Sequence, residues 1–261
     1  MPEPQSPRVA VIVPAFNEAA NLPRVISELR ECCPTWDVVV VDDGSMDNSG
    51  DVAATLGARV LRLPLNLGIG GAVQTGLIYG LRNGYDVCIQ VDGDAQHEGP
   101  ETVKLVSTLV ERRADVVVGS RFLGEGGFRS TASRRLGIQV LRTVIRLLTG
   151  YTITDPTSGH RAFGRRALGL LARDYPQEYP EPEAIYMLLR HGLHVVEIPV
   201  RMRSRAHGKS SIGVLDSLLY MVKVLLSILV EATRIARWSG CLTACWPSTA
   251  AACAGCWGTG R

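Results

Sequence analysis

The chain has 261 residues, of which 46% are hydrophobic and 20% are charged. This composition is ordinary for a globular protein, and the length allows one large domain or two small ones. The formal net charge of +3 is too small to indicate a protein that binds nucleic acid.

The amino terminus argues against secretion. Residues 1–8 contain three prolines and no apolar segment, so they do not form a signal peptide. We therefore expect the protein to remain in the cytoplasm, where its seven cysteines would be free thiols. Cys253 and Cys256 lack the second cysteine or histidine pair of a zinc site, so we do not interpret them as metal ligands.

The first half of the chain alternates short apolar runs with segments of helical periodicity. Strands are predicted at residues 9–13, 38–41, 59–63, 87–91 and 115–118, and helices at about 17–32, 47–56, 72–83 and 100–112. Continuously apolar strands between helices are typical of a parallel sheet with helices on both faces. The sequence therefore predicts an α/β fold with a mostly parallel sheet.

The second half is less regular. A glycine-rich loop is predicted at residues 124–133, helices at 136–148, 167–171 and 183–191, a strand at 194–200 and a basic loop at 201–212. Residues 214–230 carry a wide apolar stripe, interrupted by Asp216 and Lys223. These charges argue against a simple membrane span and leave two interpretations, a core helix or an amphipathic helix in the membrane interface. Residues 238–261 show no periodicity and are predicted to be a disordered or non-native tail.

Polar residues follow three of the predicted strands directly, as Pro14-Ala15, Asp42-Asp43 and Asp92-Gly93-Asp94. Ligands bind beyond the carboxyl ends of the strands in such sheets. Asp92 and Asp94 are two residues apart, so their carboxylates would project together if the extended geometry continued. Carboxylates hold Mg²⁺ or Mn²⁺ together with substrate phosphates. The sequence thus predicts a site for a metal and a diphosphate.

The order of the motifs resembles that of family 2 glycosyltransferases with the GT-A fold. The matching segments are residues 11–18 (VIVPAFNE), 41–45 (VDDGS) and 92–97 (DGDAQH). Residues 119–121 (GSR), 155–159 (DPTSG) and 205–211 (RAHGKSS) are similar to motifs of dolichyl-phosphate mannose synthases and bacterial polyprenyl-phosphate glycosyltransferases. No G-x-G-x-x-G follows the first strand, which excludes a dinucleotide-dependent oxidoreductase.

The resemblance implies a Rossmann-like GT-A catalytic domain over residues 1–237. Residues 8–120 would bind the nucleotide sugar, 121–212 the acceptor, and 213–237 would form an amphipathic, membrane-associated helix. The implied protein is an inverting, metal-dependent transferase on the cytoplasmic face of the membrane. It would move a sugar from a GDP- or UDP-linked donor to a polyprenyl or dolichyl phosphate, with Mg²⁺ or Mn²⁺.

The resemblance also implies roles for individual residues. Asp92 and Asp94 would hold the metal, with Gln96 nearby. Pro14, Ala15, Glu18 and Asp43 would contact the nucleotide. Arg121, Ser133 and either Arg134 or Arg135 would meet the acceptor phosphate, and Arg205 and Lys209 would reach the donor diphosphate. Ile69 stands where many relatives carry lysine.

The acceptor decides whether the reaction needs a base. A lipid phosphate is already anionic, whereas a sugar hydroxyl requires a general base. Asp155 is the candidate base, although it is equally placed to cap the turn at 156–159. The alternative function is therefore a GT-A transferase with a hydroxyl acceptor in polysaccharide or glycolipid synthesis. A third hypothesis is a non-catalytic nucleotide-sugar-binding protein that partners a membrane protein.

Overall fold

The computed structural model describes residues 6–124, 132–203, 222–230 and 232. The strands are β1 (Val9–Ala15), β2 (Asp37–Asp42), β3 (Arg59–Arg62), β4 (Val87–Gln90), β5 (Val116–Ser120), β6 (Arg161–Gly164) and β7 (Val195–Pro199). The helices are α1 (Leu22–Cys32), α2 (Ser49–Thr55), α3 (Gly68–Arg82), α4 (Gly99–Glu111), α5 (Ala132–Thr149), α6 (Arg165–Leu171) and α7 (Pro180–Arg190). A further helix covers residues 222–230.

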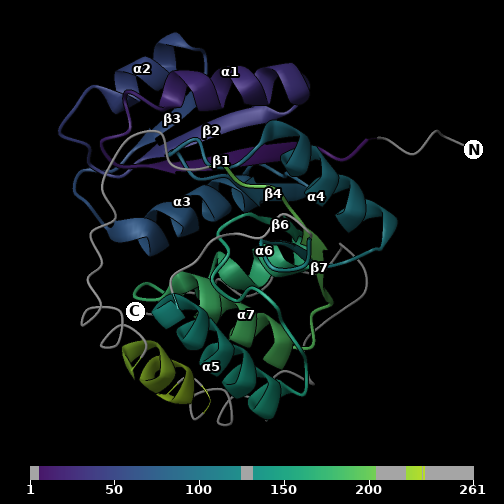
Figure 1. Ribbon diagram of the computed structural model, residues 1–261. Coiled ribbons are helices and arrows are strands. Elements are labelled where there is room, and N and C mark those ends of the chain that lie inside the picture. The colour runs from purple at the N-terminus through teal and green to yellow at the C-terminus, as the bar shows by residue number, and fades with distance from the viewer. Residues whose placement is uncertain (1–5, 125–131, 204–221, 231, 233–261) are drawn as a thin grey trace, which may run out of the picture.

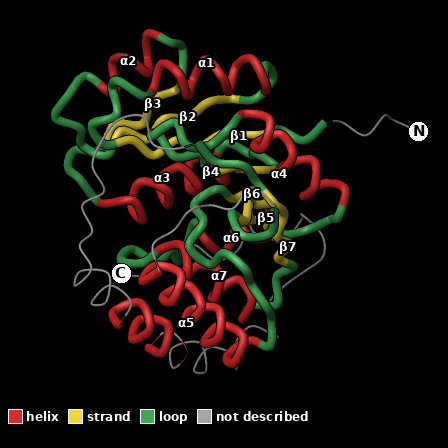
Figure 2. Tube along the Cα trace, in the orientation of Figure 1, coloured by secondary structure: helices red, strands yellow, loops and turns green. Residues whose placement is uncertain are grey.

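The strands form one seven-stranded sheet in the order β3-β2-β1-β4-β6-β5-β7. All neighbouring strands are parallel except β6, which is antiparallel to both β4 and β5. The sheet runs through the middle of the molecule (Figure 2). The expected α/β fold with a mostly parallel sheet is confirmed. The sequence analysis missed β6, because its sequence, RAFG, contains only two apolar side chains and ends in glycine.

Helices cover both faces of the sheet (Figure 1). Side chains alternate along the strands, so Ile12 packs with α3, α5, α6 and α7, while Val11 packs with α1, α2 and α4. Each face therefore has its own apolar core. This alternation explains why the central strands are continuously apolar in sequence.

Helix 222–230 is the described part of the predicted amphipathic helix at 213–237. It buries Val224 and Ile228 in the core on the α5 and α7 side, and leaves Leu226 and Leu229 about half exposed. It therefore combines a core-packed face with an exposed apolar face. Within the described part of the chain, no helix has the length and apolar character that a membrane crossing would need.

Three element boundaries differ from the prediction for local reasons. β1 continues through Pro14, because β4 pairs only with Val9–Ile12 and the missing N–H of Pro14 therefore removes no hydrogen bond to it. α1 begins at Leu22, because the chain turns at Asn17, where φ is 57°. α3 begins at Gly68, four residues before the predicted start.

The glycines at the start of α3 serve helix packing. A Cβ at Gly70 would lie 2.7 Å from the backbone of Gln177, so only glycine allows the two segments to approach this closely. The glycine-rich stretch is therefore the first turn of a helix, and the prediction that the helix starts only at Ala72 was wrong.

Packing of α3 on β1 gives a testable prediction. A Cβ at Gly76 would overlap the side chain of Ile12, which is fully buried and stiff because it is β-branched. Gly76→Ala is expected to destabilise the protein by about 1–3 kcal/mol, measured as a lower midpoint of urea unfolding. Gly169→Ala in α6, where nothing lies within 4 Å of the new Cβ, is the control and should stabilise the protein by up to about 1 kcal/mol. Equal effects of both substitutions would contradict this account of the packing.

Candidate active site

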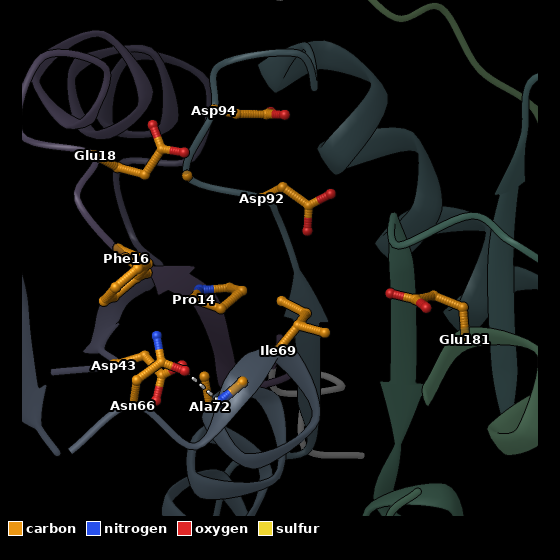
Figure 3. Close-up of a pocket in the computed structure, with 13 residues that line it drawn as sticks. Pro14, Phe16, Glu18, Asp43, Asn66, Ile69, Ala72, Asp92, Asp94 and Glu181 are labelled. Atoms are coloured by element: carbon orange, nitrogen blue, oxygen red, sulfur yellow. Dashed lines mark hydrogen bonds between the residues drawn. The ribbon is translucent and has the colours of Figure 1, made fainter. Parts of the chain in front are cut away.

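A cleft opens at the sheet edge where β1, β2 and β4 end. Ala15 pairs with Asp42, and Val91 donates to the carbonyl of Ile12 at 3.0 Å, so the three strands end close to one another. The cleft has a volume of about 410 Å³, which is typical of small-molecule sites. It is lined by Pro14, Ala15, Phe16, Glu18, Asp43, Asn66, Gly68, Ile69, Ala72, Asp92, Gly93, Asp94 and Glu181 (Figure 3).

Side-chain hydrogen bonds join the loops after β1 and β2. Asn17 Oδ1 accepts the N–H of Met46 at 2.8 Å, and its own N–H donates to Ser45 Oγ at 3.0 Å. Glu18 Oε2 accepts Asn21 Nδ2 at 2.6 Å. Asparagine tolerates the left-handed backbone at position 17 better than most residues. This wall of the cleft therefore consists of two loops that hydrogen bonds hold together.

Asp43 connects this wall to the start of α3. It is 3% exposed, and its Oδ1 accepts the N–H of Leu67 at 2.8 Å. The following residue, Gly44, has φ of +69°, and a Cβ there would lie 2.7 Å from the backbone of Leu65. The turn therefore requires glycine. Asp43 both lines the cleft and fixes the segment that brings Asn66 and Ile69 into it.

Asp92 and Asp94 both line the cleft, but not as an extended strand would place them. β4 ends at Gln90 and the chain turns at Gly93 and Asp94, so the assumed continuation of the strand was wrong. A Cβ at Gly93 would lie 3.0 Å from the carbonyl oxygen of Pro14. This close approach holds the turn against the end of β1.

The side chains of Gln90 and His97 orient the carboxylate of Asp92. Gln90 Nε2 donates to its Oδ1 at 3.2 Å, and His97 Nε2 lies 3.2 Å from its Oδ2. Burial raises the pKa of Asp92, but His97 and the hydrogen bonds outweigh this effect and lower the pKa to about 2. The side chain remains 34% exposed. Asp92 therefore presents an ionised carboxylate to the cleft at neutral pH.

His97 lies beneath Asp92 and packs against a second histidine. The ring centroids of His97 and His160 are 4.3 Å apart, and His160 Nε2 lies 3.1 Å from Thr102 Oγ1. Burial lowers the pKa of His160 well below its usual value. Both rings are buried. They therefore form a support under the acidic motif.

Gln96 points away from the cleft. The N–H of Gln96 donates to Asp94 Oδ1 at 3.1 Å, while its side chain donates to the carbonyl of Arg203 at 3.2 Å. Arg203 forms a bidentate pair with Glu28 at 2.6 and 2.9 Å. Gln96 is therefore beside Asp94, but it connects the acidic turn to the segment that precedes residue 204.

Arg121 and Asp155 form a buried ion pair away from the residues that line the cleft. Arg121 Nε and Nη2 donate to the two carboxylate oxygens at 2.7 and 2.8 Å, and the backbone N–H of Arg121 donates at 3.1 Å. Asp155 is fully buried. Burial raises its pKa, but Arg121 outweighs this effect, so the pKa is lowered. The geometry therefore favours Asp155 as the residue that orients Arg121 over Asp155 as a general base.

Of the remaining predicted residues, only Arg135 has a described side chain, and it is exposed. Ser133 and Arg134 are in the first turn of α5, where only the backbone is described. Arg205 and Lys209 belong to residues 204–221, which lie outside the described ranges. Their roles stay predictions.

The described residues can contribute to a metal site but do not complete one. No group of three or more histidine, cysteine or acidic side chains in the described ranges is arranged to hold a metal ion. Asp92 and Asp94 supply two carboxylates to the same cleft. Mg²⁺ typically binds one or two carboxylates and takes its other ligands from water and substrate phosphates. The donor set therefore fits an ion that arrives with a diphosphate.

Several residues of the cleft were not predicted. Phe16 and Ile69 lie within conspicuous sequence segments, residues 11–18 and the glycine-rich stretch after β3. Their position in these segments could have indicated that they line the cleft. Glu181 comes from the first turn of α7, which pattern analysis treated only as a helix. Its position in the cleft depends on how the second half of the chain folds back on the first.

Comparison with known proteins identifies the family. The model of "Glycosyl transferase family 2" matches residues 10–170. The chain belongs to glycosyltransferase family 2. Polyprenol monophosphomannose synthase from Mycolicibacterium smegmatis is 33% identical over 216 residues, which cover 79% of this chain and 81% of that protein. Undecaprenyl-phosphate mannosyltransferase from Micrococcus luteus is 33% identical over 215 residues, with 79% and 88% covered. The predicted relationship to the polyprenyl-phosphate group is confirmed.

A solved structure shares the fold of this glycosyltransferase. The crystal structure of glucosyl-3-phosphoglycerate synthase from Mycobacterium tuberculosis, in complex with Mn²⁺, UDP and glucosyl-3-phosphoglycerate, matches with a TM-score of 0.68. The two sequences are 23% identical, and the match covers 87% of this chain and 80% of the other. This likeness supports the predicted GT-A architecture.

The buried Arg121–Asp155 pair predicts a pH-dependent contribution to stability. Asp155→Asn leaves Arg121 without its counter-charge and is expected to cost about 3–5 kcal/mol at pH 7. Because the pKa of Asp155 is lowered on folding, this contribution is present above the usual carboxyl pKa of about 4 and is lost as the pH falls below it. The difference in urea midpoint between wild type and variant should therefore shrink from pH 7 to pH 3.

Asp51→Asn provides the control for this measurement. Asp51 pairs with Arg62 at 2.6 Å, but the two side chains are 74% and 53% exposed. The surface pair should contribute less than about 1 kcal/mol. If Asp155→Asn is as mild as this control at pH 7, the buried pair does not stabilise the second half of the fold as this account requires.

Proposed function

We propose that this glycosyltransferase moves a sugar from a GDP- or UDP-linked donor to a polyprenyl phosphate, with inversion at the anomeric carbon. The observation that carries the proposal is the meeting of Asp43, Asp92 and Asp94 in one cleft at the carboxyl edge of the sheet. Ligands bind at this edge in α/β folds of this kind. The named activities of the relatives at 33% identity supply the acceptor class.

The charge of the cleft explains why a metal would be needed. Five carboxylates line it, from Glu18, Asp43, Asp92, Asp94 and Glu181, and none of the lining residues that the structure describes is lysine or arginine. A diphosphate would be repelled by this wall unless a cation lay between them. We infer that Asp92 and Asp94 hold Mg²⁺ or Mn²⁺. The ion would act as a Lewis acid that stabilises the departing nucleoside diphosphate.

The nucleotide would occupy the opposite end of the cleft. Pro14 and Phe16 offer an apolar surface there and Asp43 offers a carboxylate, while Glu18 lies between this end and the acidic motif, with its Cγ 3.6 Å from a Cβ placed on Gly93. Carboxylates accept hydrogen bonds from the N–H groups of a base or the hydroxyls of a ribose. Because hydrogen bonds fix both loops in place, we expect this end to bind the nucleotide without rearranging.

A phosphate acceptor suits the described residues better than a hydroxyl acceptor. Both oxygens of Asp155 accept hydrogen bonds from Arg121, so the predicted general base is occupied. An anionic lipid phosphate needs no base and would be attracted to arginines. We therefore assign residues 8–120 to the donor and 121–212 to the acceptor. The hydroxyl-acceptor alternative would require a base other than Asp155.

Membrane association completes the proposal, because a polyprenyl acceptor resides in a lipid bilayer. Leu136 and Leu147 of α5 are 68% and 79% exposed, and Leu226 and Leu229 of helix 222–230 are about half exposed. Apolar side chains on amphipathic helices insert into the interface of a membrane. We propose that this end of the molecule rests on the cytoplasmic face of the membrane.

The proposal is tested by incubating the purified protein with radiolabelled GDP-mannose, UDP-glucose and UDP-N-acetylglucosamine, with MnCl₂ and a short polyprenyl phosphate. Label from at least one donor should enter the organic phase. Asp94→Asn should lower kcat by about 100-fold or more, because one metal ligand is lost. Chelation of the metal should have the same effect.

Asp86→Asn is the matched control, because Asp86 precedes β4, at the edge of the sheet opposite the cleft, is 45% exposed, and contacts Arg165 at 3.4 Å and the backbone N–H of Arg8 at 3.0 Å. Its activity should equal that of wild type. Transfer to a sugar hydroxyl acceptor, but never to a polyprenyl phosphate, would establish the alternative instead. Full activity of Asp94→Asn in the presence of a chelator would contradict the proposed role of the acidic motif.

A further inference from the structure

Glu181 is the carboxylate of the cleft that the proposed reaction leaves without a role. It is the second residue of α7 and lines the cleft together with Asp92 and Asp94. Figure 3 shows its carboxylate pointing across the cleft toward Asp92 and Ile69. It therefore faces the space between the acidic motif and the second half of the chain.

The other four carboxylates of the cleft each accept a hydrogen bond from a neighbouring residue. Their donors are Asn21 for Glu18, Leu67 for Asp43, Gln90 for Asp92 and Gln96 for Asp94. Among the described residues, Glu181 accepts a hydrogen bond only from its own backbone N–H, and none from another residue. A half-buried carboxylate without such a donor is costly unless a ligand supplies one.

A buried arginine on β6 acts electrostatically on Glu181. Arg161 is fully buried on β6, and its Nη2 donates to the carbonyl of Pro156 at 3.1 Å. Its Nε and Nη1 have no hydrogen-bond partner among the described residues. Burial raises the pKa of Glu181, and the positive charge of Arg161 opposes that effect. Arg161 therefore helps to keep Glu181 an acceptor of hydrogen bonds.

The position of Glu181 fits the sugar of the donor. In the proposed complex the metal and the diphosphate lie at Asp92 and Asp94, so the sugar, which is attached to the second phosphate, lies on the far side of that motif from the nucleotide. Glu181 and Ile69 form this part of the cleft. A carboxylate accepts strong hydrogen bonds from hydroxyl groups, and an apolar side chain packs against the C–H face of a sugar ring.

We propose that Glu181 recognises the transferred sugar, that it accepts hydrogen bonds from the hydroxyl groups of that sugar, and that it selects neutral sugars over those that carry a carboxylate. This inference rests on the proposed function. A uronic acid would place a second negative charge against Glu181, where two carboxylates repel each other. The substrate class is therefore a nucleotide-linked neutral hexose or N-acetylhexosamine.

The experiment separates binding of the sugar from binding of the nucleotide. Glu181→Ala and Glu181→Gln are compared with wild type, using the donor that wild type transfers and, in parallel, GDP or UDP alone with MnCl₂. Glu181→Ala should raise the donor KM by roughly 10- to 100-fold, because hydrogen bonds to a charged acceptor are lost. The Kd of the nucleoside diphosphate, measured by titration calorimetry, should change by less than about twofold, since the free nucleotide does not reach Glu181.

Glu181→Gln tests the charge separately from the shape. It should lose less activity with the neutral donor than Glu181→Ala does. Its ratio of kcat/KM for UDP-glucuronic acid to that for the neutral donor should rise at least about tenfold, because the repulsion is removed. Glu178→Gln, three residues earlier and exposed, is the control and should match wild type in both measurements. Unchanged melting temperatures would show that the variants fold.

Four results would overturn the inference. An unchanged donor KM with a raised polyprenyl phosphate KM would place Glu181 on the acceptor. An equal loss of affinity for the donor and the free nucleotide would mean that Glu181 acts on the shape of the whole cleft. A wild-type protein that binds Mn²⁺–nucleotide and transfers sugar, with Glu181→Ala kinetically identical, would refute this inference alone. A wild-type protein that neither binds nor transfers would overturn the proposed function as well.

Discussion

Parallel pairing of β1 with both β2 and β4 is the constraint on which the cleft depends. Because the three strands run in the same direction, their carboxyl ends reach the same edge of the sheet. Asp43 and Asp92 follow two of these ends, and Pro14 and Ala15 form the third. Had β1 been antiparallel to its neighbours, its end would lie at the opposite edge. The direction of the strands therefore decides which residues meet at the site.

Concentrating carboxylates at one edge has an electrostatic cost that the fold offsets locally. Asp92 is held by Gln90 and His97, and its pKa falls to about 2 in spite of burial. Asp43 and Glu18 each accept a hydrogen bond from a neighbouring loop or helix. These contacts orient the side chains, and those to Asp92 also keep it ionised. The negative charge of this wall favours binding of a cation, and the bound cation would in turn favour binding of a diphosphate.

Much of this arrangement could be predicted from the sequence, and the failures have physical causes. Continuous apolar runs predicted the parallel strands, because strands that are covered on both faces of the sheet are apolar along their whole length. The acidic motif was recognisable because its residues follow a strand directly. β6 was missed, since its sequence, RAFG, has only two apolar side chains and therefore gives no strand pattern. Its insertion between β4 and β5 depends on contacts between distant parts of the chain.

The same limit applies to the site. Several residues near strand ends that the sequence analysis named, including Pro14, Glu18 and Asp43, line the cleft, while their contact with a nucleotide stays a prediction. Glu181 was not named, because its place depends on how α7 packs against the first half. Arg121 and Asp155 were predicted separately, one for the acceptor and one as a base. Only the structure shows that the two residues pair with each other, through two hydrogen bonds from the guanidinium of Arg121 to the carboxylate of Asp155.

The central claim is that the paired acids at this sheet edge bind a nucleoside diphosphate through a divalent cation. Titration calorimetry of GDP and of UDP into the wild-type protein, with and without MnCl₂, measures this directly. The account predicts that one nucleotide binds in the presence of Mn²⁺ and that its affinity falls at least about 100-fold when the metal is removed. Binding of equal strength with and without metal would contradict it.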